Sequence, residues 1–118
     1  MTKHYERGDV VFFGFAIYPD SCVIGGNRPW VVVQNNMGNI HSPTTIVVPM
    51  TSRKPKRFLP THVLINWDVL KKPSIILCEQ VRTVDIKDDW LYVGRLPPEW
   101  MEQVDVSLRN AFWYERRS

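Results

Sequence analysis

The sequence has few of the residues that bind metals or crosslink small domains. Its two cysteines, Cys22 and Cys78, lack CxxC spacing, and its three histidines, His4, His41 and His62, form no HxH or HxxxH pattern. Neither set has the ligand spacing of a zinc site, and two isolated thiols are typical of a reducing compartment. We therefore expect reduced cysteines, no bound metal and no cofactor.

Long apolar segments are also missing. The longest one, from Val10 to Ile17, is far too short to span a bilayer. The first ten residues, MTKHYERGDV, carry mixed charges and lead into this segment without the small-residue cleavage site of a secretory signal. We expect a protein without a membrane anchor, located in the cytoplasm.

The excess of one charge is small, since 15 basic and 12 acidic residues give a net charge of +3. One segment is nevertheless strongly basic, because RKPKR contains Arg53, Lys54, Lys56 and Arg57. Such a loop is suited to bind the phosphates of RNA or another polyanion. A solvated turn without a ligand is the alternative.

The composition is that of one globular domain, residues 1–118, with 44% hydrophobic and 23% charged residues. Apolar, β-branched segments recur at short intervals between clusters of turn-forming residues, which predicts a mainly β fold. Several segments lack clean alternation, so both sheet faces should be covered, as in a small barrel with a packed helix or a barrel buried in a dimer. The predicted strands are residues 10–15, 30–33, 45–50, 62–65, 74–84 and 90–96.

The C-terminal segment changes character and predicts an amphipathic helix that closes the β-barrel. Prolines 97–98 and the acids Glu99 and Glu102 are typical of a helix start, and Arg116 and Arg117 of a helix end. The apolar stripe at helical spacing should pack in the core or form a dimer contact, and it consists of Trp100, Val104, Leu108, Ala111 and Phe112.

Residues 25–36, GGNRPWVVVQNN, place a short apolar strand between an Arg-Pro step and three consecutive amides. These flanks indicate that the strand ends face something polar, and we expect RNA. If residues 30–35 pair with residues 44–50 through a turn, opposed residues have numbers that add up to about 79, and Arg28 lies across from Thr51. A guanidinium and a hydroxyl would then reach one phosphate. A surface ion pair with a carboxylate is the alternative for Arg28.

The segment CEQVRT, residues 78–83, places polar residues inside an apolar strand. Two-residue alternation predicts Gln80 and Arg82 on one face. Burial of both is costly without partners. They would therefore either bind the loop backbone or form a polar floor under the phosphate site.

Five segments together resemble the MazF/PemK family of bacterial toxins: RGDV (7–10), GNRPWVVVQN (26–35), SPTTIVVPMTS (42–52), LPTHVLI (59–65) and SIILCEQVRTVD (74–85). The resemblance implies an SH3-like barrel of the MazF/CcdB type and a homodimer. It also implies an mRNA interferase, the toxin of a type II toxin–antitoxin pair, which cleaves single-stranded RNA at short motifs without a metal. A cognate antitoxin would place its C-terminal peptide in the RNA groove.

The resemblance also implies the site residues. The family's catalytic arginine, threonine and glutamine match Arg28, Thr51 and Gln80, and an additional arginine matches Arg82. The loop DSCVIGG departs from the acidic or amide residues frequent in relatives, so a relative's cleavage motif does not transfer.

The expected chemistry is attack of an RNA 2′-hydroxyl on the adjacent phosphorus, which leaves a 2′,3′-cyclic phosphate and a 5′-hydroxyl. Arg28 suits the growing charge better than it suits proton transfer, because its pKa is about 12.5 to 13.8. His41 is a candidate proton shuttle, and Trp67 or Tyr18 a candidate base-stacking residue. A CcdB-like gyrase poison and a non-catalytic RNA-binding barrel remain alternatives.

Overall fold

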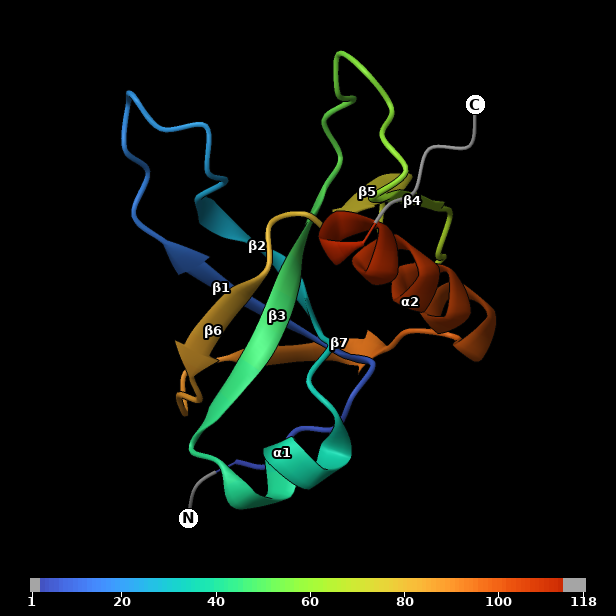
Figure 1. Ribbon diagram of the computed structural model, residues 1–118. Coiled ribbons are helices and arrows are strands. Elements are labelled where there is room, and N and C mark those ends of the chain that lie inside the picture. The colour runs from blue at the N-terminus through green and yellow to red at the C-terminus, as the bar shows by residue number, and fades with distance from the viewer. Residues whose placement is uncertain (1–2, 114–118) are drawn as a thin grey trace.

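The computed structural model describes residues 3–113, which form a mainly β fold with a C-terminal helix (Figure 1). None of the described helices is long and apolar enough to cross a membrane. The strands are β1 (Asp9–Phe15), β2 (Gly26–Val32), β3 (Thr44–Thr51), β4 (His62–Ile65), β5 (Ser74–Leu77), β6 (Arg82–Asp85) and β7 (Leu91–Arg95). The helices are α1 (Asn36–His41) and α2 (Pro98–Phe112). The predicted fold class is confirmed.

The long strand β3 organises the sheet, whose strand order is β4-β5-β3-β2-β1-β7 with β6 paired to β3 off this path. The first half of β3 pairs with β6, its middle with β2, and its last two residues with β5. Because β3 changes partners along its length, the antiparallel sheet curls into a half-barrel (Figure 1).

The predicted strand 74–84 is wrong, because it is two strands joined by a turn at residues 78–81. β5 pairs with β4 and the end of β3, whereas β6 pairs with the start of β3. The chain must therefore turn between the two partners. The alternation that placed Gln80 beside Arg82 fails with it, since Gln80 lies in the turn.

The predicted β2–β3 register is confirmed. Trp30 lies opposite Pro49, Val31 opposite Val48 and Val32 opposite Val47, so the paired numbers add up to 79. The connection is more than a turn, because it contains α1.

The three amides after β2 stabilise α1 rather than facing RNA, which corrects our expectation. The Asn35 side chain caps the helix by accepting from the Gly38 N–H at 2.8 Å. Asn39 Oδ1, which is buried, accepts from Gln34 Nε2 at 3.0 Å and from the Thr45 hydroxyl at 2.7 Å. Buried amides need such partners, so the polar cluster is structural.

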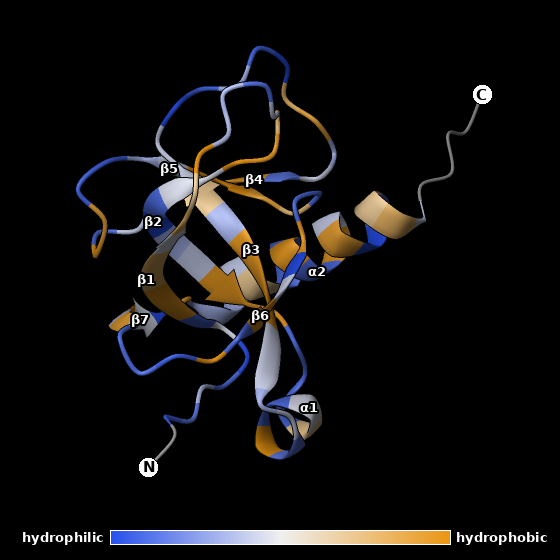
Figure 2. Ribbon diagram, turned by 90° about the vertical axis from the view of Figure 1, so that its left-hand side faces the viewer, coloured by the Kyte–Doolittle hydropathy of each residue, from blue (hydrophilic) through white to orange (hydrophobic). Residues whose placement is uncertain are grey.

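Both faces of the sheet are covered, as expected. Alternate β2 residues divide between two hydrophobic clusters, with Val31 in one and Trp30 and Val32 in the other. The hydrophobic strands and hydrophilic loops are visible in Figure 2.

The first cluster packs against α2, which contacts β4. Met101 and Val104 are buried, and Trp100 and Leu108 are partly buried. The predicted stripe is thus in the core at its start, and it missed Met101. Phe112 is 75% exposed in the single chain, so it is not a core residue, and a dimer contact there stays a prediction. The predicted helix end at Arg116 and Arg117 lies outside the described residues.

The second cluster is aromatic and occupies the inner face of the curled sheet. Phe13 stacks on Trp90 with ring centroids 4.4 Å apart and on Trp30 at 5.4 Å. Tyr5 and Phe15 extend it by contacts with Trp90 and Trp30. Offset or tilted rings of this kind stabilise beyond their buried area.

We predict that Asn39→Ala destabilises the fold without affecting catalysis. The substitution leaves the Thr45 hydroxyl without its partner, and a buried unpaired group costs about 1–3 kcal/mol. Urea unfolding measures this, with exposed Met37→Ala on the same helix as control, expected to change stability by no more than about 0.5 kcal/mol. A stable Asn39→Ala protein with impaired RNA cleavage would contradict a purely structural role of Asn39.

Candidate active site

Arg28 lies in β2 and is held by main-chain carbonyls. Its Nε and Nη2 donate to the Gly25 carbonyl at 2.8 and 2.6 Å, and Nη1 donates to the Met50 carbonyl at 3.4 Å. No carboxylate forms an ion pair with it among residues 3–113, so the surface ion-pair alternative is wrong. Burial lowers the pKa of Arg28, yet a guanidinium remains charged at neutral pH. The site therefore has a fixed, uncompensated positive charge.

Two glycines allow the preceding loop to reach the guanidinium. Gly26 has a φ of +79°, a backbone angle that residues other than glycine rarely adopt. A Cβ on Gly25 would lie 2.6 Å from the Ala16 carbonyl oxygen, so no larger residue fits there. The Gly25 carbonyl can therefore approach Arg28 directly.

Thr51 ends β3 beside Arg28, as predicted. Continuing the observed register by two residues places the two opposite each other, and directly opposed residues share a sheet face. The Thr51 hydroxyl oxygen accepts from the Arg53 N–H at 3.1 Å, which leaves its own proton available to a ligand. The structure thus brings a cation and a hydroxyl donor to one end of the sheet.

A cavity of about 450 Å³ borders both residues and is strongly basic. Arg53, Lys71 and Lys72 line it together with Arg28 and Thr51. Lys71 and Lys72 were not predicted as site residues, and the signal that could have found them is a pair of adjacent lysines before Pro73. This density of positive charge favours a phosphate-bearing ligand.

Gln80 does not bind Arg28 directly but binds the loop that holds it. Its Oε1 accepts from the Ile24 N–H at 2.7 Å, and Ile24 precedes the Gly25 carbonyl that binds the guanidinium. The side chain therefore fixes the loop that orients Arg28. Of the two roles expected for Gln80, a hydrogen bond to the loop backbone is the one observed.

Arg82 lies on the inner face of the sheet with its guanidinium 3.6 Å from the Phe15 ring centroid. Its partner in the β3–β6 ladder is Val47, which belongs to the second hydrophobic cluster. The stack is a cation–π contact and leaves the guanidinium edge available for polar contacts.

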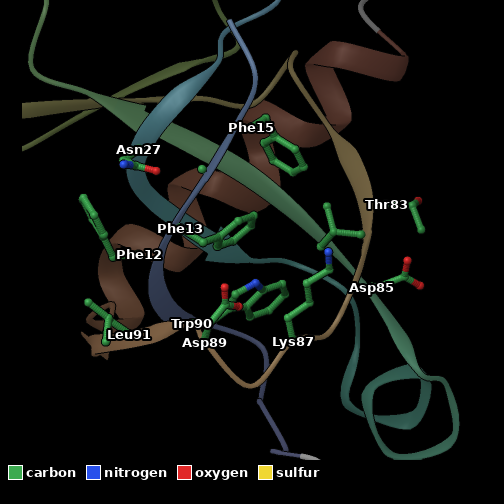
Figure 3. A pocket seen from close by; sticks show the side chains of 12 residues that line it. Phe12, Phe13, Phe15, Asn27, Thr83, Asp85, Lys87, Asp89, Trp90 and Leu91 are labelled. Atoms are coloured by element: carbon green, nitrogen blue, oxygen red, sulfur yellow. The ribbon is translucent and has the colours of Figure 1, made fainter.

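An aromatic cavity of about 540 Å³ adjoins this site (Figure 3). Phe13, Phe15 and Trp90 lie at its centre, and Phe12 and Asn27 border both this cavity and the basic one. Phe13 and Phe15 were missed as residues of this cavity, although their spacing in FFGF puts them on one strand face. Phe12, which is 37% exposed, is the ring at the rim that a base could reach, and exposed rings beside cations are typical of single-stranded nucleic-acid sites.

The two predicted stacking residues have different positions. Trp67 is 7% exposed and belongs to the hydrophobic cluster under α2, so the stacking prediction is wrong for it. Tyr18 is 68% exposed in the loop between β1 and β2 and stays a candidate.

The predicted RNA-binding cations lie on the loop that follows β3. Arg53, Lys54, Lys56 and Arg57 are exposed, and this loop starts directly at Thr51 (Figure 1). Their placement agrees with a role in guiding RNA toward Arg28.

His41 is not brought to the site. It ends α1 at the opposite end of β3 from Thr51 (Figure 1), and the intervening strand spans about 23 Å. A proton shuttle must reach within hydrogen-bonding distance, so within one chain the His41 prediction is wrong.

The cysteines are both free, Cys22 exposed and Cys78 buried. Burial raises the pKa of Cys78 to about 12, which makes it unreactive. Within the described residues, no three His, Cys, Asp or Glu side chains gather as they would around a metal ion.

Comparisons with known proteins agree on one family. Residues 6–112 match the family of PemK-like, MazF-like toxins of type II toxin–antitoxin systems. Endoribonuclease EndoA of Bacillus subtilis (strain 168) is 40% identical over 106 residues, which cover 88% of this chain and 90% of EndoA.

Solved structures show the same fold. A mycobacterial endoribonuclease in complex with its cognate antitoxin has a TM-score of 0.72 at 25% identity, covering 92% of this chain and 94% of its own. MazF from Deinococcus radiodurans has a TM-score of 0.78 at 20% identity, covering 93% and 97%. This chain belongs to the family of PemK-like, MazF-like toxins of type II toxin–antitoxin systems.

Proposed function

We propose that this chain is an endoribonuclease that cleaves single-stranded RNA and acts as the toxin of a type II toxin–antitoxin pair. One observation carries the proposal: the guanidinium of Arg28 is fixed by two carbonyls, has no carboxylate partner among residues 3–113, and lies opposite the Thr51 hydroxyl. The 40% identity to an endoribonuclease supports it.

The reaction is internal transesterification of RNA. The 2′-hydroxyl loses its proton and attacks the adjacent phosphorus, the bond to the 5′-oxygen breaks, and that oxygen takes up a proton. The products are a 2′,3′-cyclic phosphate and a 5′-hydroxyl. The phosphoryl oxygens gain charge in the transition state, so fixed donors aimed at them accelerate the step.

Arg28 supplies the main electrostatic stabilisation. Because its Nε and Nη2 already bind Gly25, the free edge of the guanidinium is pre-organised before RNA arrives. Thr51 donates its hydroxyl proton to the same phosphoryl oxygens, and Gln80 keeps the Ile24–Gly25 loop in place. Arg82 contributes a second cation on the inner face.

RNA binding uses the basic loop and the rim of the aromatic cavity. Arg53, Lys54, Lys56 and Arg57 neutralise phosphates, and the exposed rings of Phe12 or Tyr18 stack on bases. We expect cleavage in the cytoplasm without a metal or cofactor.

The protein partners follow from the family. We propose that the chain forms a homodimer and that the C-terminal peptide of a cognate antitoxin occupies the RNA groove. The basic cavity at Arg28 favours an acidic peptide, and a similar mycobacterial endoribonuclease is known in complex with its antitoxin.

The proposal is tested by incubating the protein with a long single-stranded RNA in EDTA and mapping the fragment ends. We predict discrete fragments with cyclic-phosphate and 5′-hydroxyl ends. Arg28→Ala should lower kcat about 10²- to 10³-fold, and Arg28→Lys should not restore it, because an ammonium lacks the planar fork. RNA that stays intact with the wild-type protein would contradict the proposal and favour a gyrase poison or a non-catalytic RNA-binding barrel.

We predict that the basic loop sets the salt dependence of RNA binding. For single strands the slope of log K against log salt is about 0.7 per neutralised phosphate, so the double variant Lys56→Gln/Arg57→Gln should flatten it by about 1.4. Arg109→Gln on α2 removes one exposed cation outside residues 53–57 and serves as control. An unchanged slope in the double variant would exclude the loop from RNA binding.

A further inference from the structure

The buried imidazole of His62 lies where two substrate-facing segments meet. His62 begins β4, and its side chain is only 4% exposed. On one side it contacts the end of the basic loop, and on the other the turn that carries Gln80. None of its contacts is with Arg28 or Thr51 themselves.

Each ring nitrogen binds a different segment. Nδ1 accepts from the Leu59 N–H at 3.1 Å, and Nε2 lies 3.1 Å from Glu79 Oε2. Because Nδ1 accepts a hydrogen bond, the ring proton resides on Nε2 and is donated to the carboxylate. The two contacts together select one tautomer and one ring orientation.

The His62–Glu79 contact is connected to Arg28 by two further hydrogen bonds and by residues adjacent in the chain. Glu79 is held by the His62 ring and by the Thr61 hydroxyl, which donates to Oε1 at 3.0 Å. The next residue, Gln80, accepts from the Ile24 N–H, and the adjoining Gly25 carbonyl binds Arg28. A displaced Glu79 would therefore displace the support of the guanidinium.

The Leu59 contact fixes the far end of the basic loop. Leu59 lies two residues after Arg57, and the neighbouring Phe58 ring meets the His62 ring edge-on with centroids 5.4 Å apart. The Pro60 carbonyl is also bound, by Asn110 of α2 at 3.1 Å. The loop that carries the cations is thus anchored beside the turn that carries Gln80.

We infer that His62 is a positioning residue of the ribonuclease, whose two nitrogens separately control transition-state stabilisation, through Glu79, and RNA binding, through Leu59. The inference rests on the proposed function. It predicts that substitution of His62 can separate the two roles. An Asn at this position places a polar atom near the Nδ1 position only, and a Gln places one near the Nε2 position only.

The variants His62→Asn and His62→Gln test this separation in cleavage kinetics. Asn keeps an acceptor for Leu59 but does not reach Glu79, so kcat should fall about 10- to 100-fold with KM within about twofold. Gln keeps a donor for Glu79 but loses Leu59, so KM should rise roughly threefold to tenfold with kcat nearly retained. Glu79→Leu, which has a similar shape but no acceptor, should reproduce the kinetic defect of His62→Asn from the other partner of the contact.

Backbone amide exchange followed by NMR provides a second readout that needs no RNA. Faster exchange is expected at Ile24 in His62→Asn and Glu79→Leu, and at Leu59 in His62→Gln. The double variant His62→Asn/Glu79→Leu should be no worse than either single variant, because both remove the same contact.

The inference would be overturned if folded His62→Asn and Glu79→Leu proteins kept wild-type exchange at Ile24. It would also be overturned if all variants lowered kcat and raised KM by one common factor in step with their loss of Tm, since His62 would then be a packing residue only. A wild-type protein with the expected exchange pattern that left RNA intact would instead contradict the proposed function.

Discussion

The pairing of β2 with β3 is the constraint on which the site depends. Their register places Arg28 across from Thr51, and the period of two in a strand determines which side chains share that face. A slip by one residue would turn Arg28 to the other side of the sheet from Thr51. The buried residues on both sides of β2 make such a slip costly, so the hydrophobic core itself specifies the site.

The curl of the sheet brings further segments next to the site, which the pairing of β2 and β3 alone does not do. Because β3 pairs with β6, β2 and β5 in turn, the turn at residues 78–81 comes close to the loop before β2. The cations gather at one end of β3, and α1 with its structural amides occupies the other end. The polar residues at one end of this strand therefore stabilise the fold, and those at the other end are the ones for which we propose a role in catalysis.

Features that depend on local periodicity could be predicted from the sequence, and features that depend on strand partners could not. The register of β2 and β3 follows from two adjacent apolar segments, so Arg28 and Thr51 were found together. Whether residues 74–84 form one strand or two depends on which part of β3 pairs with each half. This pairing is non-local, so the prediction of a single strand placed Gln80 wrongly. Trp67 and Phe15 are equally apolar in sequence, and only the fold decides which ring is buried.

The central claim is that the Arg28 guanidinium is fixed before RNA binds. The most direct test is the hydrogen exchange of its Nε–H, observed by NMR in the free protein and with a 2′-O-methylated single-stranded RNA that cannot react. The structure predicts slow exchange in the free protein, since Nε–H is bound to Gly25, and a shift of the Nη resonances when RNA binds. An Arg28 Nε–H that exchanges as fast as that of exposed Arg57 would contradict the account.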